Sequence, residues 1–97
     1  MVNEYDRALM AAPSVEGDCC AVCGRFPVEK HHVVFRSRGG SNGAVIPLCG
    51  FGNTSGCHGL AHSYRLHFRY EDGWEYFLAD EPVKYDKALG MDGWRRL

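Results

Sequence analysis

Two kinds of metal-ligating side chain, thiols and imidazoles, alternate between residues 20 and 62. The thiols form two pairs, Cys20 with Cys23 and Cys49 with Cys57. A Cys-x-x-Cys pair followed by a glycine, here Gly24, is typical of a zinc knuckle, because both thiolates leave one tight turn on the same side. With the second pair, four thiolates can complete a tetrahedral structural Zn²⁺ site.

A fifth cysteine, Cys19, leaves an alternative open. It can replace Cys20 as a ligand with a Cys-x3-Cys spacing, although the shorter spacing favours Cys20. Disulfides or buried free thiols are the other interpretation of these cysteines. An odd cysteine count and the lack of a secretory signal argue against a disulfide framework, so we expect metal ligands.

The imidazoles are arranged as a neighbouring pair and a spaced pair. His31 and His32 lie in a Val- and Phe-rich segment, residues 28–35, that reads as a strand, so they point to opposite faces unless a bulge splays them. This predicts two different roles. His58 and His62 are four residues apart after Cys57, which puts both on one face of a helix. If that helix runs to about residue 70, Arg65 and Arg69 extend the same face. The alternative interpretation is that His58 and His62 are ordinary surface residues.

The ordered set of motifs resembles the HNH endonucleases. The set comprises Cys-x-x-Cys, Glu-x-His-His, Arg-Ser-x-Gly-Gly, Leu-Cys and Cys-His-x-x-x-His, and it covers roughly residues 20–62. The glycine-rich spacer between Cys49 and Cys57 is similar to that of small phage and prophage members. The resemblance implies a ββα-metal unit that holds one divalent catalytic ion and cleaves DNA.

Carried over by position, the resemblance implies a role for each ligand. His31 is expected to bind the catalytic ion, His32 to act as the general base, and His58 to be the ligand from the helix. His62 is expected to be a third ligand or a phosphate contact. The structural Zn²⁺ belongs to Cys20, Cys23, Cys49 and Cys57.

One position departs from the family pattern. Ala44 stands where the family has its middle Asn, which braces the loop that carries the general base. Asn42 lies two residues earlier, on the same face if this segment is a strand, and is the preferred replacement; Asn53 is the alternative.

Phosphodiester hydrolysis needs an activated water, a cation and groups that hold the phosphate. An imidazole such as His32 has a suitable ordinary pKa for the base. The expected phosphate or DNA contacts are arginines, which suit phosphate geometry: Arg36, Arg38, Arg65 and Arg69. Among Mg²⁺, Mn²⁺, Ni²⁺ and Zn²⁺, imidazole ligands favour the last three over Mg²⁺.

The length predicts a single domain, and the local patterns and the resemblance together predict an α+β fold. The chain has 97 residues, 45% of them hydrophobic and 24% charged, so its core is small and a structural metal is a natural supplement. We expect residues 20–66 to form the zinc-stabilised ββα-metal core, residues 1–19 an N-terminal helix and linker, and residues 67–97 an added β-hairpin and short helix.

The local patterns predict the elements within these parts. Strands are expected over 28–35 and 44–48, with a basic Gly- and Ser-rich loop at 36–43 between them. The helices are expected over 3–10, from residue 57, and over 83–89, the last with Pro82 in its first turn and Gly90 at its end. A hairpin over 68–78 turns at Glu71-Asp72-Gly73.

Charge is distributed unevenly along the chain. Residues 20–70 carry a net charge of +5, whereas residues 1–19 and 71–97 each carry −3, which gives −1 in total. A cationic centre between acidic flanks suits a phosphate-handling site. No stretch approaches a membrane span, and the expected location is cytoplasmic, with a phage origin suggested by the resemblance.

The expected partners are DNA and, for sequence specificity, a second copy in a homodimer or phage packaging proteins. The alternative function is a catalytically silent zinc-binding module of the same fold that binds DNA or a protein. A zinc-ribbon redox or storage protein is a third interpretation, which leaves the histidines and arginines unexplained.

Overall fold

The computed structural model describes residues 4–34, 43–52 and 54–97. Within these ranges the chain forms an α+β fold with three helices and five strands. In chain order the elements are α1 (Glu4–Met10), β1 (Val28–His32), β2 (Val45–Cys49), α2 (Gly56–His62), β3 (Leu66–Tyr70), β4 (Trp74–Leu78), α3 (Tyr85–Leu89) and β5 (Arg95–Arg96). The described helices include none long and apolar enough to cross a membrane.

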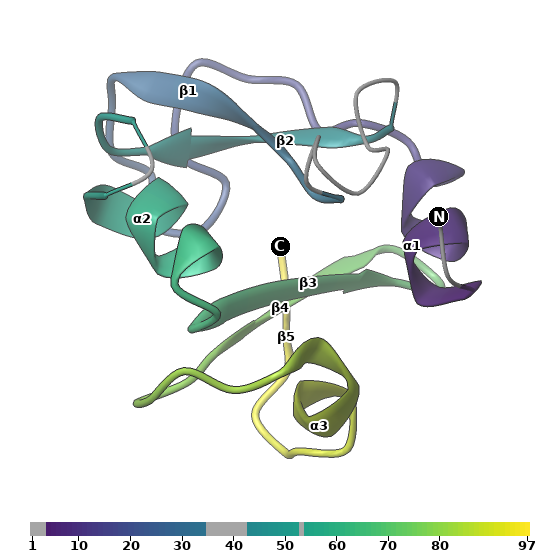
Figure 1. Ribbon diagram of the computed structural model, residues 1–97. Helices are drawn as coiled ribbons and strands as arrows, with labels where there is room; N and C mark the ends of the chain where they lie inside the picture. Colours follow the sequence, from purple (N-terminus) through teal and green to yellow (C-terminus); the bar gives the residue numbers. More distant parts are fainter. Residues whose placement is uncertain (1–3, 35–42, 53) are drawn as a thin grey trace.

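The strands form two antiparallel sheets. β1 pairs with β2 from Val28 opposite Cys49 to His32 opposite Val45 without a break in register. The second sheet has the order β3-β4-β5. In Figure 1 the β1–β2 sheet and α2 lie above this second sheet, α3 lies below it, and α1 stands at one end. The two strands and the following helix that the local patterns predict are therefore present as β1, β2 and α2.

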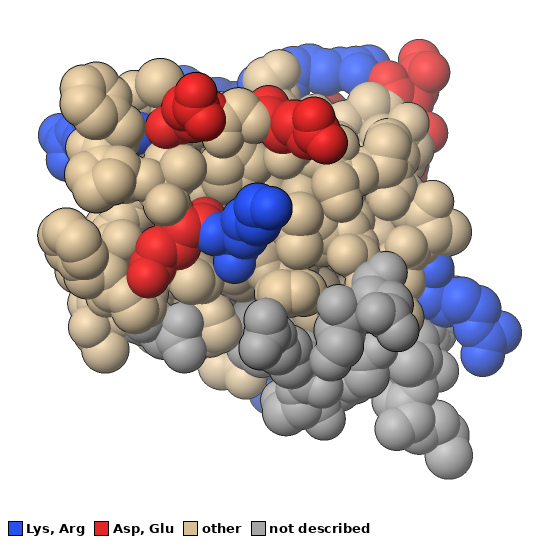
Figure 2. All heavy atoms as spheres, turned by 90° about the horizontal axis from the view of Figure 1, so that it is seen from above, with Lys and Arg blue, Asp and Glu red and all other residues tan. Residues whose placement is uncertain are grey.

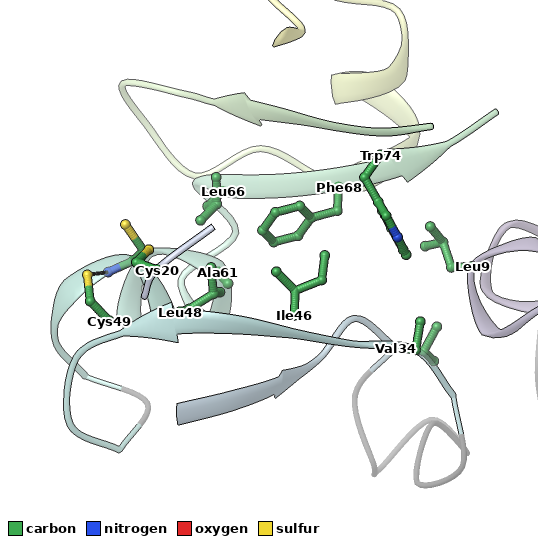
Figure 3. Close-up of a cluster of buried hydrophobic side chains, with 12 residues drawn as sticks. Leu9, Cys20, Val34, Ile46, Leu48, Cys49, Ala61, Leu66, Phe68 and Trp74 are labelled. Carbon is green, nitrogen blue, oxygen red and sulfur yellow. Dashed lines mark hydrogen bonds between the residues drawn. The ribbon is translucent and has the colours of Figure 1, made fainter. Parts of the chain in front are cut away.

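The main core lies between the β1–β2–α2 layer and the β3–β4 hairpin. Ile46 and Leu48 of β2 are fully buried, and Phe68 of β3 is almost so. Figure 3 shows Phe68 directed toward Ile46, with Ala61 of α2 and Trp74 of β4 on either side. Burial of such side chains stabilises a fold by about 1.5–3 kcal/mol each. The hairpin therefore covers the apolar face of the β1–β2–α2 layer.

A second, smaller core lies on the other face of the hairpin. Phe77, Ala79 and Ala88 are buried there, with Val83 and Trp94 packed against them. Alternate residues of a strand point to opposite faces, so Phe68 enters the main core while its neighbour Arg69 lies on the side of Trp94. This alternation separates Arg69 from the face of the hairpin that covers β2.

The N-terminal segment is fixed to the main core. Leu9 of α1 is buried there, and the indole Nε1–H of Trp74 donates to the carbonyl of Pro13 at 2.7 Å. Val15 N–H donates to the carbonyl of Val45 at 2.9 Å, which extends the contact to β2. The predicted linker therefore packs along the second strand.

Helix α2 ends at His62, so the extension of this helix to about residue 70 was wrong. Tyr64 adopts a left-handed backbone with φ +63°, and the N–H of Arg65 donates to the carbonyl of Leu60 at 3.0 Å. Both features close the helix one residue after its C-cap, Ser63. The following apolar residues then alternate as strand β3, which makes the hairpin longer than the predicted 68–78.

Other boundaries differ by a few residues. The first strand ends at His32 rather than at residue 35, and the second spans Val45–Cys49 rather than 44–48. The last helix begins at Tyr85 with Lys84 as its N-cap, so Pro82 is not in its first turn; Gly90 is its C-cap, as predicted. The N-terminal helix and the turn at residues 71–73 are confirmed.

Candidate metal centres

The first cysteine pair is presented by a hydrogen-bonded turn. Cys20 N–H donates to the carbonyl of Arg25 at 2.7 Å, and Gly24 N–H donates to the carbonyl of Cys20 at 2.9 Å. Gly24 has φ +79°, a conformation that glycine adopts without strain. Ala21 N–H donates to the carbonyl of Pro47, which fixes the turn against β2. The knuckle is thus held beside the end of β2, where Cys49 lies.

The second pair is brought together by a tightly closed loop. Cys49 ends β2 and Cys57 lies in the first turn of α2, and the N–H of Cys57 donates to the sulfur of Cys49 at 3.4 Å. A Cβ on Gly56, which has φ +61°, would lie 2.5 Å from the carbonyl oxygen of Cys49. A Cβ on Gly50 would overlap the carbonyl of Ser55. Glycine is required at both ends of this loop.

The four predicted thiols meet in one cluster. The sulfurs of Cys20, Cys23, Cys49 and Cys57 all lie within 4.8 Å of one another. The Cys23 and Cys49 sulfurs are 3.5 Å apart, and those of Cys57 and Cys23 are 3.8 Å apart. Zn–S bonds of about 2.3 Å in a tetrahedron place sulfurs about 3.8 Å apart, so the cluster fits a zinc ion. Cys19 is exposed and outside the cluster, which favours Cys20 as the ligand.

The thiols of the cluster differ in acidity. Burial raises the pKa of Cys20, but backbone hydrogen bonds from Cys23, Cys49 and Val22 outweigh it and bring this pKa to about 7. Burial, followed by the neighbouring Cys20 sulfur, raises the pKa of Cys57 far above its ordinary value. Four adjacent thiolates repel one another, so complete ionisation requires a cation among them.

Three of the predicted histidines form a second cluster. His31 of β1 packs against both His58 and His62 of α2, with ring centroids 5.1 and 5.3 Å away, and the two helix rings are 4.9 Å apart, so the three rings form a triangle. One ring nitrogen of each lies within 4.8 Å of the others. His31 and His58 are buried and His62 is half-buried. Three imidazoles whose ring nitrogens converge in this way could hold a metal ion.

Burial and, less strongly, neighbouring charges disfavour protonation of His31 and His62. Burial, followed by the charges of His58, His62 and His32, lowers the pKa of His31 to about 3. Burial, followed by the charge of His58, also lowers the pKa of His62. Neutral imidazoles present lone pairs, so both shifts favour metal binding at neutral pH.

Glu29 is the site residue that the sequence interpretation missed. Its Oε1 accepts a hydrogen bond from Nδ1–H of His58 at 3.1 Å, and this contact, followed by a backbone hydrogen bond from Gly52, lowers the pKa of Glu29. Nδ1–H bonding to a carboxylate leaves Nε2 of His58 as the ligand atom, as in other carboxylate–histidine–metal arrangements. The signal was available, because Glu29 and His31 share one face of a strand.

His32 lies outside both clusters. It pairs with Val45 at the end of β1, and the regular register turns its side chain away from that of His31. It is half-buried, and its charge contributes to the lowered pKa of His31. His32 is therefore near the three-histidine cluster without being one of its members.

The position of the family's middle Asn is occupied by a core residue. Ala44 is 4% exposed, and its carbonyl accepts a hydrogen bond from the N–H of Val33 at 3.1 Å. The two candidate replacements, Asn42 and Asn53, lie outside the described residues, as do Arg36 and Arg38.

The two described arginines among the expected phosphate contacts do not form a stripe with the helix histidines. Arg65 donates from Nε to the carbonyl of Ala79 at 3.1 Å. Arg69 donates from Nε to Glu75 at 2.8 Å, and its guanidinium lies 4.3 Å from the ring centroid of Trp94. Figure 2 shows the face above the β1–β2 sheet, where basic and acidic side chains of the described residues are interspersed without a continuous basic patch.

The fifth histidine has a different place. His67 of β3 is buried, donates from Nε2 to the carbonyl of Tyr64 at 2.9 Å and packs near the ring of Tyr85. It ties the end of α2 to α3 and belongs to neither metal cluster.

Comparisons of the chain with models of protein families, with curated proteins and with solved structures found no match. The site and the fold are the basis for any functional assignment.

Proposed function

We propose that the chain is a metal-dependent endonuclease of the HNH type that hydrolyses phosphodiester bonds in DNA. The observation that supports it best is the convergence of His31, His58 and His62 beside a separate four-cysteine cluster. A structural site uses four protein ligands, whereas a catalytic site keeps a position open. The four-cysteine cluster matches a structural zinc site, and the three-histidine cluster matches a site for a catalytic ion.

The proposed chemistry divides the roles among the histidines. His31, His58 and His62 bind the divalent ion, and Glu29 holds His58 in the tautomer that this requires. A divalent ion there would supply positive charge for the scissile phosphate and for the departing 3′ oxygen. His32, outside the ligand set, accepts the proton of the attacking water. The ion is Mg²⁺, Mn²⁺, Ni²⁺ or Zn²⁺, with imidazole ligands favouring the last three.

Of the four arginines proposed to contact DNA, the two that the structure describes differ in how much of their side chain is free to bind phosphate. Arg36 and Arg38 are retained as proposed phosphate contacts, on the resemblance alone. Arg65 keeps donors beyond the Nε that Ala79 occupies. Arg69 is paired with Glu75 and stacked on Trp94, so we assign it a smaller share of DNA binding.

The test is conversion of supercoiled plasmid to nicked or linear DNA, with Mg²⁺, Mn²⁺, Ni²⁺ and Zn²⁺ supplied separately. His32→Ala should retain its fold and its zinc but cut about 10²–10⁴-fold more slowly, since that is the usual contribution of a general base. Lys30→Ala, which truncates an exposed side chain on the same face of β1, should retain turnover. If His32→Ala cuts at the wild-type rate, His32 is not the general base. If the wild-type protein cuts DNA with none of the ions, it is not a nuclease.

A specific observation favours a second function, a catalytically silent module that binds DNA or a protein. The bracing Asn of the family is replaced by Ala44, whose side chain packs in the core. Such a module binds its partner equally well after His32→Ala. The plasmid assay therefore separates the two functions, because only a nuclease has a cutting rate for His32→Ala to lower.

A further inference from the structure

A cleft separate from both metal clusters lies in the C-terminal part of the chain. Its volume is about 840 Å³, within the range of roughly 300–1,000 Å³ that is common for ligand-binding clefts. One wall is formed by residues 76–83, from the end of β4 onward, and the other by Met91, Asp92, Gly93 and Arg95, which lead into β5. The cleft shares no residue with either metal cluster.

The edge of β4 is open where it borders this cleft. β5 pairs with β4 only at Glu75 and Tyr76, so Leu78 has no strand residue opposite it on this side. The N–H of Ala79 donates to the carbonyl of Arg65, toward β3, and the backbone groups of successive strand residues alternate in direction. The N–H and carbonyl of Leu78 therefore point away from β3, and no backbone group of the described residues bonds to them.

The two walls of the cleft offer apolar surface and are held in place. Leu78 on one wall is 50% exposed, and Met91 on the other is 47% exposed. The ring of Trp94 stacks on that of Phe77 with centroids 5.5 Å apart, and its Nε1–H donates to the carbonyl of Ala88 at 2.9 Å. These contacts fix the second wall against β4, so the cleft is formed before any partner binds.

The charge of the cleft is acidic. Asp80 and Glu81 on one wall and Asp92 on the other are exposed, against the single cation Arg95. In the part of the chain that the structure describes, no ion pair neutralises these three carboxylates. Such a surface repels phosphate groups and attracts cationic ones. Its charge therefore favours a basic partner over a nucleic acid.

We propose that this cleft binds an extended segment of a partner protein that carries both basic and apolar residues. The main chain of the segment adds to the open edge of β4 at Leu78, because a peptide strand supplies the donor and the acceptor that this edge lacks. Its apolar side chains contact Leu78 and Met91, and its lysines or arginines pair with Asp80, Glu81 and Asp92. The inference goes beyond the proposed function and does not rest on it.

The first experiment measures binding of a short fluorescein-labelled peptide, in which lysine alternates with valine, to the full-length protein by fluorescence anisotropy. One reference peptide has glutamate in place of lysine, and another is N-methylated along its backbone so that it cannot add to a strand. Both should bind about tenfold more weakly, since main-chain hydrogen bonds and opposite charge supply the affinity. No binding of the lysine peptide, or equal binding of either reference peptide, would overturn the proposal.

Substitutions in the chain test whether the peptide occupies the cleft. Leu78→Ala should weaken binding of the lysine peptide about tenfold through lost apolar contact, whereas Leu97→Ala, an exposed leucine outside the cleft, should leave it unchanged. Asp92→Asn should weaken binding about two- to fivefold at low salt. Glu71→Gln removes the same charge from the hairpin turn, outside the cleft, and should have little effect. If the control variants weaken binding as much as the cleft variants, the attraction is non-specific and the proposal is wrong.

Two further measurements distinguish the proposed segment from other occupants. Sedimentation of the protein should show the same oligomeric state with and without the lysine peptide. A dimer that the peptide dissociates and that Leu78→Ala prevents would make the cleft a contact between two copies of the chain and would refute the proposal. Single-stranded and duplex oligonucleotides should not displace the labelled peptide at physiological salt, and displacement by either would place DNA in the cleft instead.

Discussion

Cys57 and His58 are consecutive residues of α2, yet their side chains enter two different metal clusters. The step of about 100° between neighbours on a helix is what separates them. Cys57 turns toward Cys49 and Cys23, whereas His58 turns toward His31 of β1. One turn of helix therefore fixes both clusters relative to each other. A substitution that disrupts the first turn of α2 should disturb both clusters.

We expect Cys57→Ala to lose its zinc and to be largely unfolded at 25 °C. Structural zinc sites contribute about 10–16 kcal/mol of apparent binding free energy, which a domain of this size cannot replace from its core. Metal analysis after dialysis and far-ultraviolet circular dichroism measure both effects. Cys19→Ser is the matched control, because Cys19 is exposed and outside the cluster. A folded Cys57→Ala protein would show that this cluster does not stabilise the chain.

Gly56→Ala should destabilise the zinc loop far more than Gly52→Ala. Both glycines have a left-handed backbone, with φ +61° and +60°, so either substitution carries strain of roughly 1–2 kcal/mol. Only at Gly56 does the new methyl group meet backbone, 2.5 Å from the carbonyl oxygen of Cys49, whereas Gly52 has nothing within 4 Å. Zinc retention against a chelator should fall in Gly56→Ala alone. Similar retention by both variants would mean that close approach at Gly56 is unimportant.

Ile46→Ala should lower the free energy of unfolding by about 2–5 kcal/mol, because it leaves a cavity beneath Phe68 in the main core. Urea unfolding followed by tryptophan fluorescence measures the change. Leu78→Ala truncates a side chain that is 50% exposed and should change stability by about 0.5 kcal/mol or less. If the two variants are equally stable, the hairpin does not seal the core in solution.

Stability should fall as the pH is lowered below about 6.5, the ordinary pKa of histidine. The pKa of His31 is about 3 in the folded chain, so between these two values the unfolded chain binds the additional proton and is favoured. The full effect of this one group has an upper limit of about 5 kcal/mol. Urea unfolding without added divalent ion, from pH 7.5 to pH 5, should show a flatter dependence in His31→Leu, while His62 and His67 continue to act in both proteins. An equal slope in the two proteins would show that His31 is not buried as described.

The members of the four-cysteine cluster and the pair His58 and His62 could be predicted because their spacing constrains them, whereas His31 was assigned through the resemblance. Cys-x-x-Cys forces one turn, and His58 and His62 share a helix face at i and i+4. Glu29 could also have been found from its alternation with His31. The hairpin centred on residues 71–73 already places Arg69 opposite Glu75, so its ion pair could have been predicted too.

The end of α2 could not be predicted in the same way. The sequence after His62 fits both a helical stripe and a strand, and the choice is made by Tyr64 in a left-handed conformation that non-glycine residues rarely adopt. The packing of Phe68 on β2 then favours the strand. The stacking of Arg69 on Trp94 depends on residues 25 positions apart and has no local signal.

The shared core has a consequence for protein engineering. Ile46 and Leu48 are covered by Leu66, Phe68 and Trp74 as well as by α2, and the indole of Trp74 also anchors the segment around Pro13. A fragment of residues 20–66 transplanted into another protein would carry all seven residues of the two clusters but would expose the apolar face of β2 to water. A chimera that is to keep both clusters must therefore include the β3–β4 hairpin, or the host protein must provide another apolar surface that covers β2.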